Sequence, residues 1–464
     1  MLSTRSHARW AAATLTVGLV ALGAGPLGAT ARAASAGVGQ SDFNGDGYAD
    51  LVVGASGGTV GGQSQAGYLV VMYGGPHGLS STREAAFSRA TTGIPGNPAK
   101  GERFGVQVSK GDLDRDGYTD LVVSGTGSSS VILWGSAKGL SGGTAVPGYG
   151  SASETGDFNG DGRLDLALFQ TNFNDGDDPT GTKAVVWYGP VTRTGTPART
   201  AVLDPGALAY LDVEDGATGD VNHDGRTDLA VSEYCGDGSY CDQLYYGSST
   251  GLVPAPQLSV PQGFRAVALG DVNGDGYDEV VTGDSYDNVI TVAYGSASGL
   301  TPRDTWKDFT QDTPGVPGVD ESEDGFGASV TVGDVTGDGF ADVAVGSPGE
   351  ALGETQGAGD VTLLHGSRSG LTGTGAQVVT QNTAGIPGVA EANDFFGAKV
   401  QLLDINGNGY ADLAAAATGE NSDTGAVWEV RGRPTGLVSD AAIDFGPVGL
   451  RTPSARATFG SLLR

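Results

Sequence analysis

The sequence predicts an all-β fold, a seven-bladed β-propeller, from three observations. One acidic phrase recurs seven times along the 464 residues. Each copy is followed by short apolar runs that end in Gly-rich turns, and outside the N-terminal segment no long stretch shows helical periodicity. Repeats at blade-sized intervals indicate small sheets that bury their faces only by stacking around a ring.

The repeated phrase reads as a loop followed by a strand. Its copies begin at residues 42, 112, 157, 220, 271, 334 and 404, and we number the loops 1 to 7 in that order. A second apolar run follows each copy, as in YLVVMYGGPHGL (68–79) and ITVAYGSASGL (290–300). Runs that are apolar at successive positions are typical of strands covered on both faces.

The two ends of the chain predict how the ring closes. Phe104-Gly105, Phe326-Gly327 and Phe396-Gly397 precede loops 2, 6 and 7, whereas loop 1 has no Phe-Gly strand before it. An unmatched Phe459-Gly460 stands near the C-terminus. We therefore expect residues 457–464 to pair into the first blade, which removes the exposed edges of an open array.

The loops follow the pattern D-x-[DN]-x-[DN]-G-x-x-[DE], which predicts calcium binding. Oxygen-bearing side chains stand at positions 1, 3, 5 and 9, glycine at position 6 allows a sharp turn, and a backbone carbonyl at position 7 adds a ligand. Calcium takes six to eight hard oxygen ligands in flexible geometry. An EF-hand is excluded because position 12 is a strand residue instead of Glu. Simple hairpin turns are disfavoured because seven groups of clustered carboxylates would repel.

The predicted cofactor is Ca²⁺, up to seven ions. The expected ligands stand at positions 1, 3, 5, 7 and 9 of each loop. They are Asp42, Asn44, Asp46, Tyr48 and Asp50; Asp112, Asp114, Asp116, Tyr118 and Asp120; Asp157, Asn159, Asp161, Arg163 and Asp165; Asp220, Asn222, Asp224, Arg226 and Asp228; Asp271, Asn273, Asp275, Tyr277 and Glu279; Asp334, Thr336, Asp338, Phe340 and Asp342; and Asp404, Asn406, Asn408, Tyr410 and Asp412.

The number of carboxylates ranks the predicted sites, because ligand charge tunes calcium affinity. Loop 2 has four carboxylates at positions 1, 3, 5 and 9 and should bind most tightly, whereas loop 7 has two and should bind most weakly. Thr336 leaves the occupancy of loop 6 open. In loop 5, Asp278 stands beside Glu279, so the last ligand is open between them.

The N-terminus predicts export. Arg5, His7 and Arg9 precede the apolar run 11–24, and Ala31-Arg32-Ala33 follows as a small-x-small cleavage pattern. We expect residues 1–33 to be a signal peptide, with cleavage after Ala36 as second choice, and residues 34–464 to be one secreted propeller. The apolar run is shorter than the ~20 residues that span a bilayer.

The net charge limits the classes of binding partner, and the two cysteines predict a disulfide. The formal charge is −29, which disfavours binding to nucleic acid or to anionic membrane surfaces. Cys235 and Cys241 are the only cysteines, with five residues between them in CGDGSYC, and in an oxidising compartment they predict a disulfide that closes a Gly-rich hairpin tip.

The combined pattern resembles a known family. The Phe-Gly elements, the acidic loops, and segments such as Gly54-Ala55-Ser56 and Gly346-Ser347-Pro348 are similar to the FG-GAP repeat of the integrin α-subunit head and of many bacterial secreted proteins. The resemblance covers nearly all of the chain after the signal peptide. It implies that the long loops before the Phe-Gly strands lie on the face opposite the calcium loops and carry ligand contacts.

No catalytic residue is predicted. Ser56 and Ser249 match G-x-S-x-G, but no helix follows either one, and the histidines at 77, 223 and 365 have no nearby nucleophile. Scattered acids, at positions 175, 177, 178, 321, 323 and 324, could form a carboxylate pair, but we interpret them as solvated loop residues.

Loop lengths point to recognition. Four long Gly-Pro-containing segments, here called the Gly-Pro loops, span residues 91–105, 312–327, 382–397 and 446–460 and predict a binding surface on blades 6, 7, 1 and 2. We expect a monomeric adhesion or recognition module whose ligand is an extracellular protein or glycan. The alternative is an extracellular hydrolase or lyase acting on carbohydrate or a phosphoester, since propellers host both.

Overall fold

The structure is a computed structural model that describes residues 41–464, apart from residues 128, 174–178, 204–211, 237–238 and 256–263. Side chains are also not described at positions 173, 235, 239–241 and 264–265. The chain divides into two compact units, Met1–Ala34 and Ser35–Arg464. The predicted signal peptide and its cleavage site lie outside the described residues, and the two-part division of the chain into leader and propeller stays a prediction.

Seven antiparallel sheets of four strands make up the second unit, and each is a blade. Strands are given in their hydrogen-bonded order. Blade 1 is β28 (Phe459–Leu463), β1 (Leu51–Ala55), β2 (Tyr68–Met72) and β3 (Glu84–Phe87). Blade 2 is β4 (Gln107–Gly111), β5 (Asp120–Ser124), β6 (Ser129–Trp134) and β7 (Ser141–Pro147). Blade 3 is β8 (Ala152–Gly156), β9 (Asp165–Phe173), β10 (Pro179–Tyr188) and β11 (Arg199–Val202).

The remaining four blades follow the same scheme. Blade 4 is β12 (Asp212–Gly219), β13 (Asp228–Gly236), β14 (Ser239–Tyr246) and β15 (Val253–Pro254). Blade 5 is β16 (Phe264–Gly270), β17 (Glu279–Asp284), β18 (Val289–Ala293) and β19 (Lys307–Phe309). Blade 6 is β20 (Ser329–Gly333), β21 (Asp342–Ser347), β22 (Asp360–His365) and β23 (Thr372–Val379). Blade 7 is β24 (Phe396–Leu403), β25 (Asp412–Ala417), β26 (Ala426–Arg433) and β27 (Gly436–Phe445).

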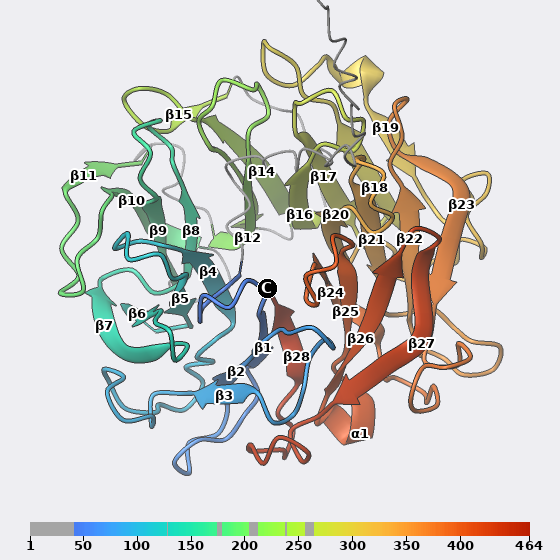
Figure 1. Ribbon diagram of the computed structural model, residues 1–464, viewed down its shortest axis with the longest axis horizontal. Coiled ribbons are helices and arrows are strands. Elements are labelled where there is room, and N and C mark those ends of the chain that lie inside the picture. The colour runs from blue at the N-terminus through green and yellow to red at the C-terminus, as the bar shows by residue number, and fades with distance from the viewer. Residues whose placement is uncertain (1–40, 128, 174–178, 204–211, 237–238, 256–263) are drawn as a thin grey trace, which may run out of the picture. The chain divides into compact units, whose positions relative to one another are not determined.

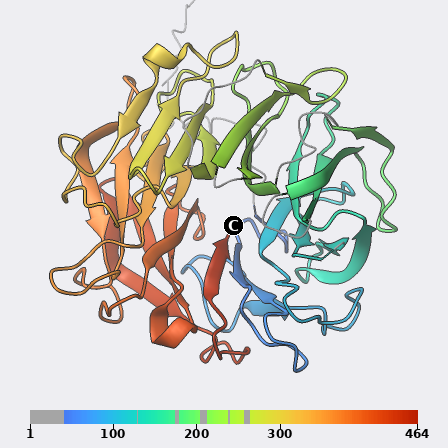
Figure 2. The same ribbon diagram turned by 180° about the vertical axis from the view of Figure 1, so that it is seen from behind.

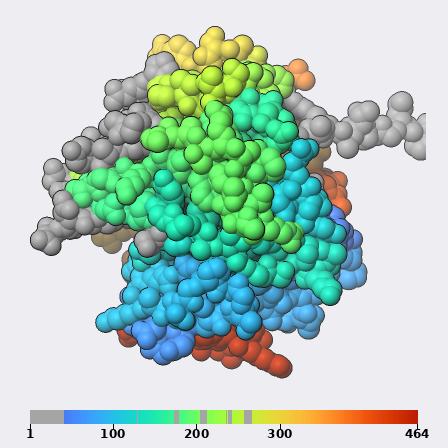
Figure 3. All heavy atoms as spheres, turned by 90° about the vertical axis from the view of Figure 1, so that its left-hand side faces the viewer, coloured from blue at the N-terminus to red at the C-terminus, as the bar shows by residue number. Residues whose placement is uncertain are grey.

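The first strand of each blade lies nearest the axis of the ring, as Figure 1 and the reverse view in Figure 2 show. Residues of β4, β8, β12, β16, β20 and β24, with Arg464 just after β28, line one central cavity of about 140 Å³. Seen from the edge, successive blades stack side by side from light blue to green (Figure 3). The predicted seven-bladed propeller is confirmed.

The C-terminal strand closes the ring, as predicted. β28 pairs antiparallel with β1, with Val53 opposite Leu463 and Gly54 opposite Leu462. The N–H of Val52 also donates to the carbonyl of Arg464 at 2.9 Å, and the N–H of Arg464 donates back at 3.1 Å. The first blade is therefore built from residues about 400 positions apart in the sequence.

The hydrophobic core lies between neighbouring blades, which explains why the second strands are apolar at successive positions. Every residue of β1, β5 and β21 is buried, because neighbouring blades cover both faces of these second strands. The phenylalanines that precede or begin the inner strands, at positions 104, 326, 396 and 459, are at most 1% exposed. Each one fills the space between two sheets, so the Phe-Gly element works as an interblade wedge.

Charged side chains fill part of the central cavity. The guanidinium of Arg464 lies 2.9 Å from a carboxylate oxygen of Asp215 and 3.5 Å from one of Glu154, and it donates to the carbonyl of Gly216. Asp215 and Gly216 belong to β12, so this arginine spans the ring from blade 1 to blade 4. Lys110 lies in the same cavity and donates to Ser41.

Helical structure in the described residues is limited to single turns. The 3-10 turn η2 covers Arg303–Thr305, and α1 covers Glu420–Asp423. α1 is a left-handed turn, since Asn421 and Ser422 have φ of 53° and 60°. No helix in the described part of the chain has the length and hydrophobicity needed to cross a membrane.

Ring closure makes Phe459 as important as its counterparts in other blades. Phe459 and Phe326 are both fully buried, so we expect Phe459→Ala and Phe326→Ala each to lower the free energy of unfolding by roughly 3–5 kcal/mol. Urea denaturation of both variants is the measurement. Arg456→Ala, at an exposed position of the same segment, should change it by less than about 0.5 kcal/mol. A wild-type midpoint for Phe459→Ala alone would show that β28 does not close the ring.

Candidate metal-binding loops

The seven acidic loops occupy equivalent places in the ring. Loops 2 to 7 each join the inner strand of a blade to its second strand, and loop 1 leads into β1. All seven therefore lie on one face of the ring, at the ends of the inner strands. The Gly-Pro loops lead into inner strands and lie on the opposite face, where the second strands end.

The carboxylate at position 1 organises each loop. In all seven loops its two oxygens accept the N–H groups of positions 5 and 6, at 2.8–3.2 Å. The side-chain oxygen of position 5 accepts the N–H of position 7 at 3.0–3.2 Å. These bonds fold nine residues into a compact turn with its oxygens on the inside.

Glycine at position 6 is a conformational requirement. Its φ lies between 78° and 94° in every loop, a region that side chains with a Cβ rarely adopt. The next residue brings its N–H to position 5 because of this bend. The sequence pattern thus predicts the loop geometry correctly.

The oxygens of loop 2 converge as a metal site requires. Carboxylate oxygens of Asp112, Asp114 and Asp116 lie within 4.8 Å of one another. At position 3, the side-chain oxygens of Asn44, Asp114, Asn159, Asn222 and Asn273 accept the N–H of position 5 and so point into their loops.

The carboxylate at position 9 has a second role that the sequence does not reveal. It is at most 1% exposed in all seven loops. In six loops one of its oxygens accepts the N–H of a glycine at the end of the third strand or just after it, at 2.8–3.1 Å. In five loops the other oxygen accepts the N–H of position 2 at 2.8–2.9 Å. Position 9 therefore connects its loop to two strands of the blade.

Burial makes these carboxylates costly to ionise in the absence of a cation. Desolvation, reinforced by the acids of the same loop, raises the pKa of Asp50, Asp120, Asp165 and Asp228 to about 7. The same causes raise the pKa of Glu279 to about 8. A bound cation would lower these values by stabilising the charged form.

One buried oxygen suits a cation ligand. The hydroxyl oxygen of Thr336 in loop 6 is buried without a hydrogen-bond partner. Unpartnered buried oxygens are rare and costly. Together with the convergent carboxylates of loop 2, this oxygen indicates that the donor set of these loops suits a hard, oxygen-seeking cation.

The structure distinguishes Glu279 from Asp278 in loop 5. Glu279 takes the place of the position 9 aspartates, with its Oε2 accepting the N–H of Val272 at 2.8 Å. Asp278 instead accepts the N–H of Asp220, in loop 4 of the preceding blade, at 2.7 Å. Glu279 is therefore the loop's own ninth residue, and Asp278 joins two blades.

Adjacent loops are bonded to one another around the ring. At six of the seven junctions, the carbonyl of position 1 accepts the N–H of position 8 in the next loop, at 2.8–3.4 Å. Examples are Thr119 N–H to Asp42 and Ala411 N–H to Asp334. The junction from loop 7 to loop 1 uses Ala49 N–H and the carbonyl of Asp404. A change in the conformation of one loop therefore alters a hydrogen bond to the neighbouring loop.

Arginine side chains compete for three loops, which sequence reasoning missed. Arg193, between β10 and β11, places its guanidinium 2.5 Å from an oxygen of both Asp114 and Asp116 in loop 2. Arg163 and Arg226, at position 7, pair with the position 5 aspartates of loops 3 and 4 at 3.2 and 2.9 Å. A ranking of the sites by the number of carboxylates alone therefore ignores the positive charge of Arg193 beside loop 2, the loop with the most carboxylates.

Family models match all seven loops. The FG-GAP repeat model matches residues 34–72, 326–364 and 396–430, and the FG-GAP-like repeat model matches residues 112–168 and 220–282. The chain is an FG-GAP repeat β-propeller. Its similarity is to the N-terminal part of integrin α-subunits, as the sequence pattern indicated.

Curated relatives of this propeller are integrin α-subunits. Integrin alpha-3 of Cricetulus griseus is 30% identical over 157 residues, which cover 34% of this chain and 14% of that protein. Integrin alpha-E of Mus musculus is 37% identical over 106 residues, covering 22% and 9%. Integrin alpha-PS2 of Drosophila melanogaster is 28% identical over 280 residues, covering 56% and 19%. The chain matches less than a fifth of the length of each of these relatives.

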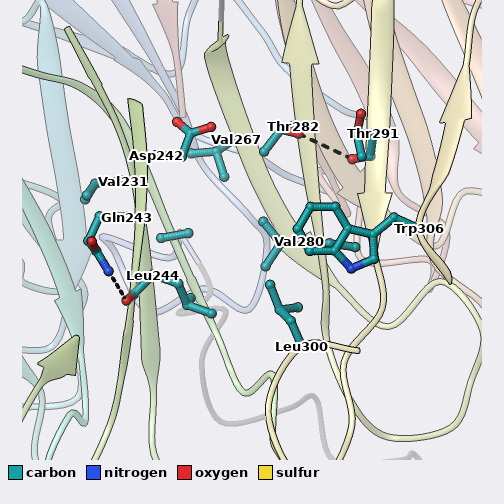
Figure 4. A pocket seen from close by; sticks show the side chains of 12 residues that line it. Val231, Asp242, Gln243, Leu244, Val267, Val280, Thr282, Thr291, Leu300 and Trp306 are labelled. Carbon is teal, nitrogen blue, oxygen red and sulfur yellow. Dashed lines mark hydrogen bonds between the residues drawn. The ribbon is translucent and has the colours of Figure 1, made fainter. Parts of the chain in front are cut away.

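A small crevice between blades 4 and 5 is too narrow for a ligand. It measures about 20 Å³, roughly the room for one water molecule. Asp242 lines it together with Leu244, Val280 and Trp306 (Figure 4). Burial raises the pKa of Asp242 to about 7. The crevice is therefore a packing feature of this junction.

The predicted disulfide stays a prediction. The side chains of Cys235 and Cys241 lie outside the described residues. Their backbones belong to the β13–β14 hairpin, in which Tyr234 pairs with Tyr240.

Arg193 provides a test of the competing charge in loop 2. Removing it frees Asp114 and Asp116, so we expect Arg193→Ala to raise the affinity of loop 2 for Ca²⁺ by about fivefold, the equivalent of one partly exposed ion pair. Calcium titration by calorimetry measures the change. Arg199→Ala is the matched control, because Arg199 packs on the ring of Tyr188 in the same blade. Weaker calcium binding in Arg193→Ala would mean that the arginine supports the site.

Proposed function

We propose that this propeller is a secreted, calcium-stabilised recognition module that binds an extracellular protein through the face opposite its acidic loops. The similarity to integrin α-subunits supports the class of function, and the predicted signal peptide supports secretion. The observation that carries the proposal is the distribution of exposed apolar side chains over the described residues.

Exposed apolar residues gather on the Gly-Pro loop face. Of the eight large apolar side chains that are exposed in the described part, five lie at this face. Four belong to the Gly-Pro loops: Val319 (61% exposed), Val389 (68%), Phe395 (36%) and Val448 (75%). The fifth is Tyr286 (87%), in the turn after β17. Exposed apolar side chains gathered in one region mark an interaction site.

The residues form a band over blades 5, 6, 7 and 1. The loop 312–327 is joined to the Tyr286 turn through Asn288, which donates to Asp320 at 3.0 Å. The Gly-Pro loop of blade 2 contributes no such residue, because its Ile94 is buried. The proposed surface is therefore displaced by one blade from the one that loop length predicts.

A protein partner suits this surface better than a glycan. Three of the five side chains are valines, which offer methyl groups to an apolar surface but no ring to stack on a sugar. Tyr286 and Phe395 are the two aromatic rings, on different blades. Aliphatic contact around a few aromatic anchors is typical of protein interfaces.

The alternative, a hydrolase or lyase, needs an acid and a base open to substrate. The central cavity holds Lys110, Glu154 and Arg464, and burial raises the pKa of Glu154 to about 8. Arg464 is paired with Glu154 and Lys110 donates to Ser41, however, and the cavity of about 140 Å³ is small. Ligand pockets measure roughly 300–1,000 Å³. The cavity therefore favours a brace across the ring, and the recognition function is preferred.

Calcium should be part of the stability of this module. If Ca²⁺ binds only the folded loops, each ion adds about 2.7 kcal/mol at a hundredfold excess over its dissociation constant. We expect EDTA to lower the melting temperature in calorimetry at matched ionic strength, and Ca²⁺ to restore it. Identical melting in EDTA and in Ca²⁺ would contradict the proposal that the loops bind calcium.

The recognition face is tested by removing its apolar side chains. We expect the variant Tyr286→Ser/Val319→Ser/Val389→Ser/Val448→Ser to lose binding at least about tenfold, since these side chains supply the contact. The measurement is retention of the purified protein on arrays of extracellular proteins and of glycans, in Ca²⁺.

Val202→Ser/Val253→Ser is the matched control, because these exposed valines lie on the outer strands of blades 3 and 4. Wild-type binding by the four-residue variant, or equal loss in the control, would refute the proposed face. Binding to glycans alone would refute the protein partner.

A further inference from the structure

Two acidic groups lie on the Gly-Pro loop face, away from the seven loops. The first is Glu321, Asp324 and Glu350 in blade 6, and the second is Glu391, Asp394 and Glu420 in blade 7. In each group, carboxylate oxygens of all three residues lie within 4.8 Å of one another. Two residues come from the Gly-Pro loop before the inner strand, and the third follows the second strand of the same blade. The two groups are therefore one arrangement built twice.

Backbone contacts fix each group in place. Asp324 and Asp394 are only 3% and 2% exposed, which corrects the interpretation of Asp324 as a solvated loop residue. Asp324 accepts the N–H of Glu321 at 2.8 Å, and Asp394 accepts the N–H of Glu391 at 2.6 Å. The carbonyl of Asp324 also accepts the N–H of Gly349, so the loop is bonded to the turn that carries Glu350. Of the other acids interpreted as solvated, those at 175, 177 and 178 lie outside the described residues.

A buried glutamine is directed into each group. Gln311 and Gln381 are each 1% exposed. Their Nε2 atoms donate to Oε2 of Glu350 at 2.8 Å and of Glu420 at 2.7 Å. Their Oε1 atoms are buried and have no hydrogen-bond partner. An amide held by a carboxylate of the group therefore offers it an unused oxygen, the kind of ligand that a cation takes.

Blade 6 adds a fourth carboxylate. Asp360, the first residue of β22, is 3% exposed and lies opposite Ser347 of β21. Burial, with the charges of Glu350 and Asp324 nearby, raises the pKa of Asp360 to about 8. In blade 7 the residue at the same register is Ala426. Blade 6 thus has one more buried carboxyl group than blade 7.

In blade 2 an arginine side chain occupies the position that glutamine occupies in blades 6 and 7. Arg89 stands two residues after Phe87, just as Gln311 stands two residues after Phe309. Its Nε lies 2.7 Å from Oε1 of Glu102, the residue at the position of Asp324. Ala99 replaces Glu321. Blade 2, with the single carboxylate of Glu102, has a buried guanidinium at this place. Blades 6 and 7, with three carboxylates each, have a neutral glutamine amide instead.

We propose that the groups in blades 6 and 7 are calcium sites of a second kind, on the face opposite the seven loops. The ligands are Glu321, Asp324, Glu350 and Oε1 of Gln311 in blade 6, with Asp360 in addition, and Glu391, Asp394, Glu420 and Oε1 of Gln381 in blade 7. Calcium fits a site made of carboxylates and an amide oxygen from separate segments, whereas Mg²⁺ prefers strict octahedral geometry and keeps its waters. Each ion joins the blade to the end of the preceding one, because Gln311 follows β19 and Gln381 follows β23.

Ion counting tests the proposal directly. The probe is Ca²⁺ alone, and the measurement is the number of ions retained by the purified protein in native mass spectrometry and equilibrium dialysis. We expect Glu350→Gln and Glu420→Gln each to lose one ion relative to wild type, and the double variant to lose two. Glu323→Gln is the matched control, because Glu323 is exposed, lies between two ligands and belongs to neither group. A wild-type ion count in the double variant would overturn the proposal, as would an equal loss in the control.

Melting in EDTA and in Ca²⁺ separates metal binding from a structural role. In EDTA, Glu350→Gln should melt at or above the wild-type temperature, since one repelling charge is gone; in Ca²⁺ it should melt below wild type. Gln311→Arg, which copies blade 2, should lose one ion and stay stable in EDTA. An equal fall in both media would assign Glu350 a structural role only and overturn the site. Melting that follows pH and ignores Ca²⁺ would show carboxyl groups sharing a proton, which also overturns it.

The proposal is independent of the recognition function, because a protein that bound no partner would still hold these ions. Retention of Mg²⁺ in place of Ca²⁺ at equal concentration would refute the assignment to calcium.

Discussion

The buried carboxylate at the ninth position of each loop is the group on which the architecture depends. Its oxygens accept backbone N–H groups from its own loop and from the turn after the third strand. Through the carbonyl of position 1, the same loop is bonded to the loop of the next blade. An ionised carboxylate in such a place is unfavourable unless it is compensated. The bonds that hold blades together therefore also create the demand for positive charge.

That demand explains where the acidic residues of this chain stand. The formal charge of −29 is concentrated at strand ends, on the loop face in seven repeats and on the Gly-Pro face in blades 6 and 7. Arginine meets the demand locally where the chain supplies one, as Arg193 does in loop 2 and Arg89 in blade 2. Elsewhere the proposed calcium ions would supply the positive charge. On that proposal, fold stability and metal binding are two results of one arrangement.

Local sequence motifs could be predicted from the sequence, and side-chain contacts between distant segments could not. The seven loops, their glycines and the closing strand follow from patterns of about ten residues, and the structure confirms the ring they imply. The contact of Arg193 with loop 2 could not be predicted, because Arg193 stands 79 positions after Asp114 and only the packing of blade 3 on blade 2 brings them together. Asp324 was misjudged because its burial depends on the turn at Gly349, which belongs to a different segment. Exposure at loop tips, as at Tyr286, likewise depends on neighbours that no local pattern describes.

Closure by β28 also bears on the rate at which this protein folds. Blades 2 to 7 each consist of strands that are consecutive in sequence, so each can assemble soon after its residues are available. Blade 1 has to wait for a partner about 400 residues away. Pairing of such distant segments is intrinsically slow, and unpaired strand edges promote aggregation while they last. The lifetime of the open ring, with β1 and β24 exposed at its gap, is therefore the interval in which this chain is most vulnerable to misassembly.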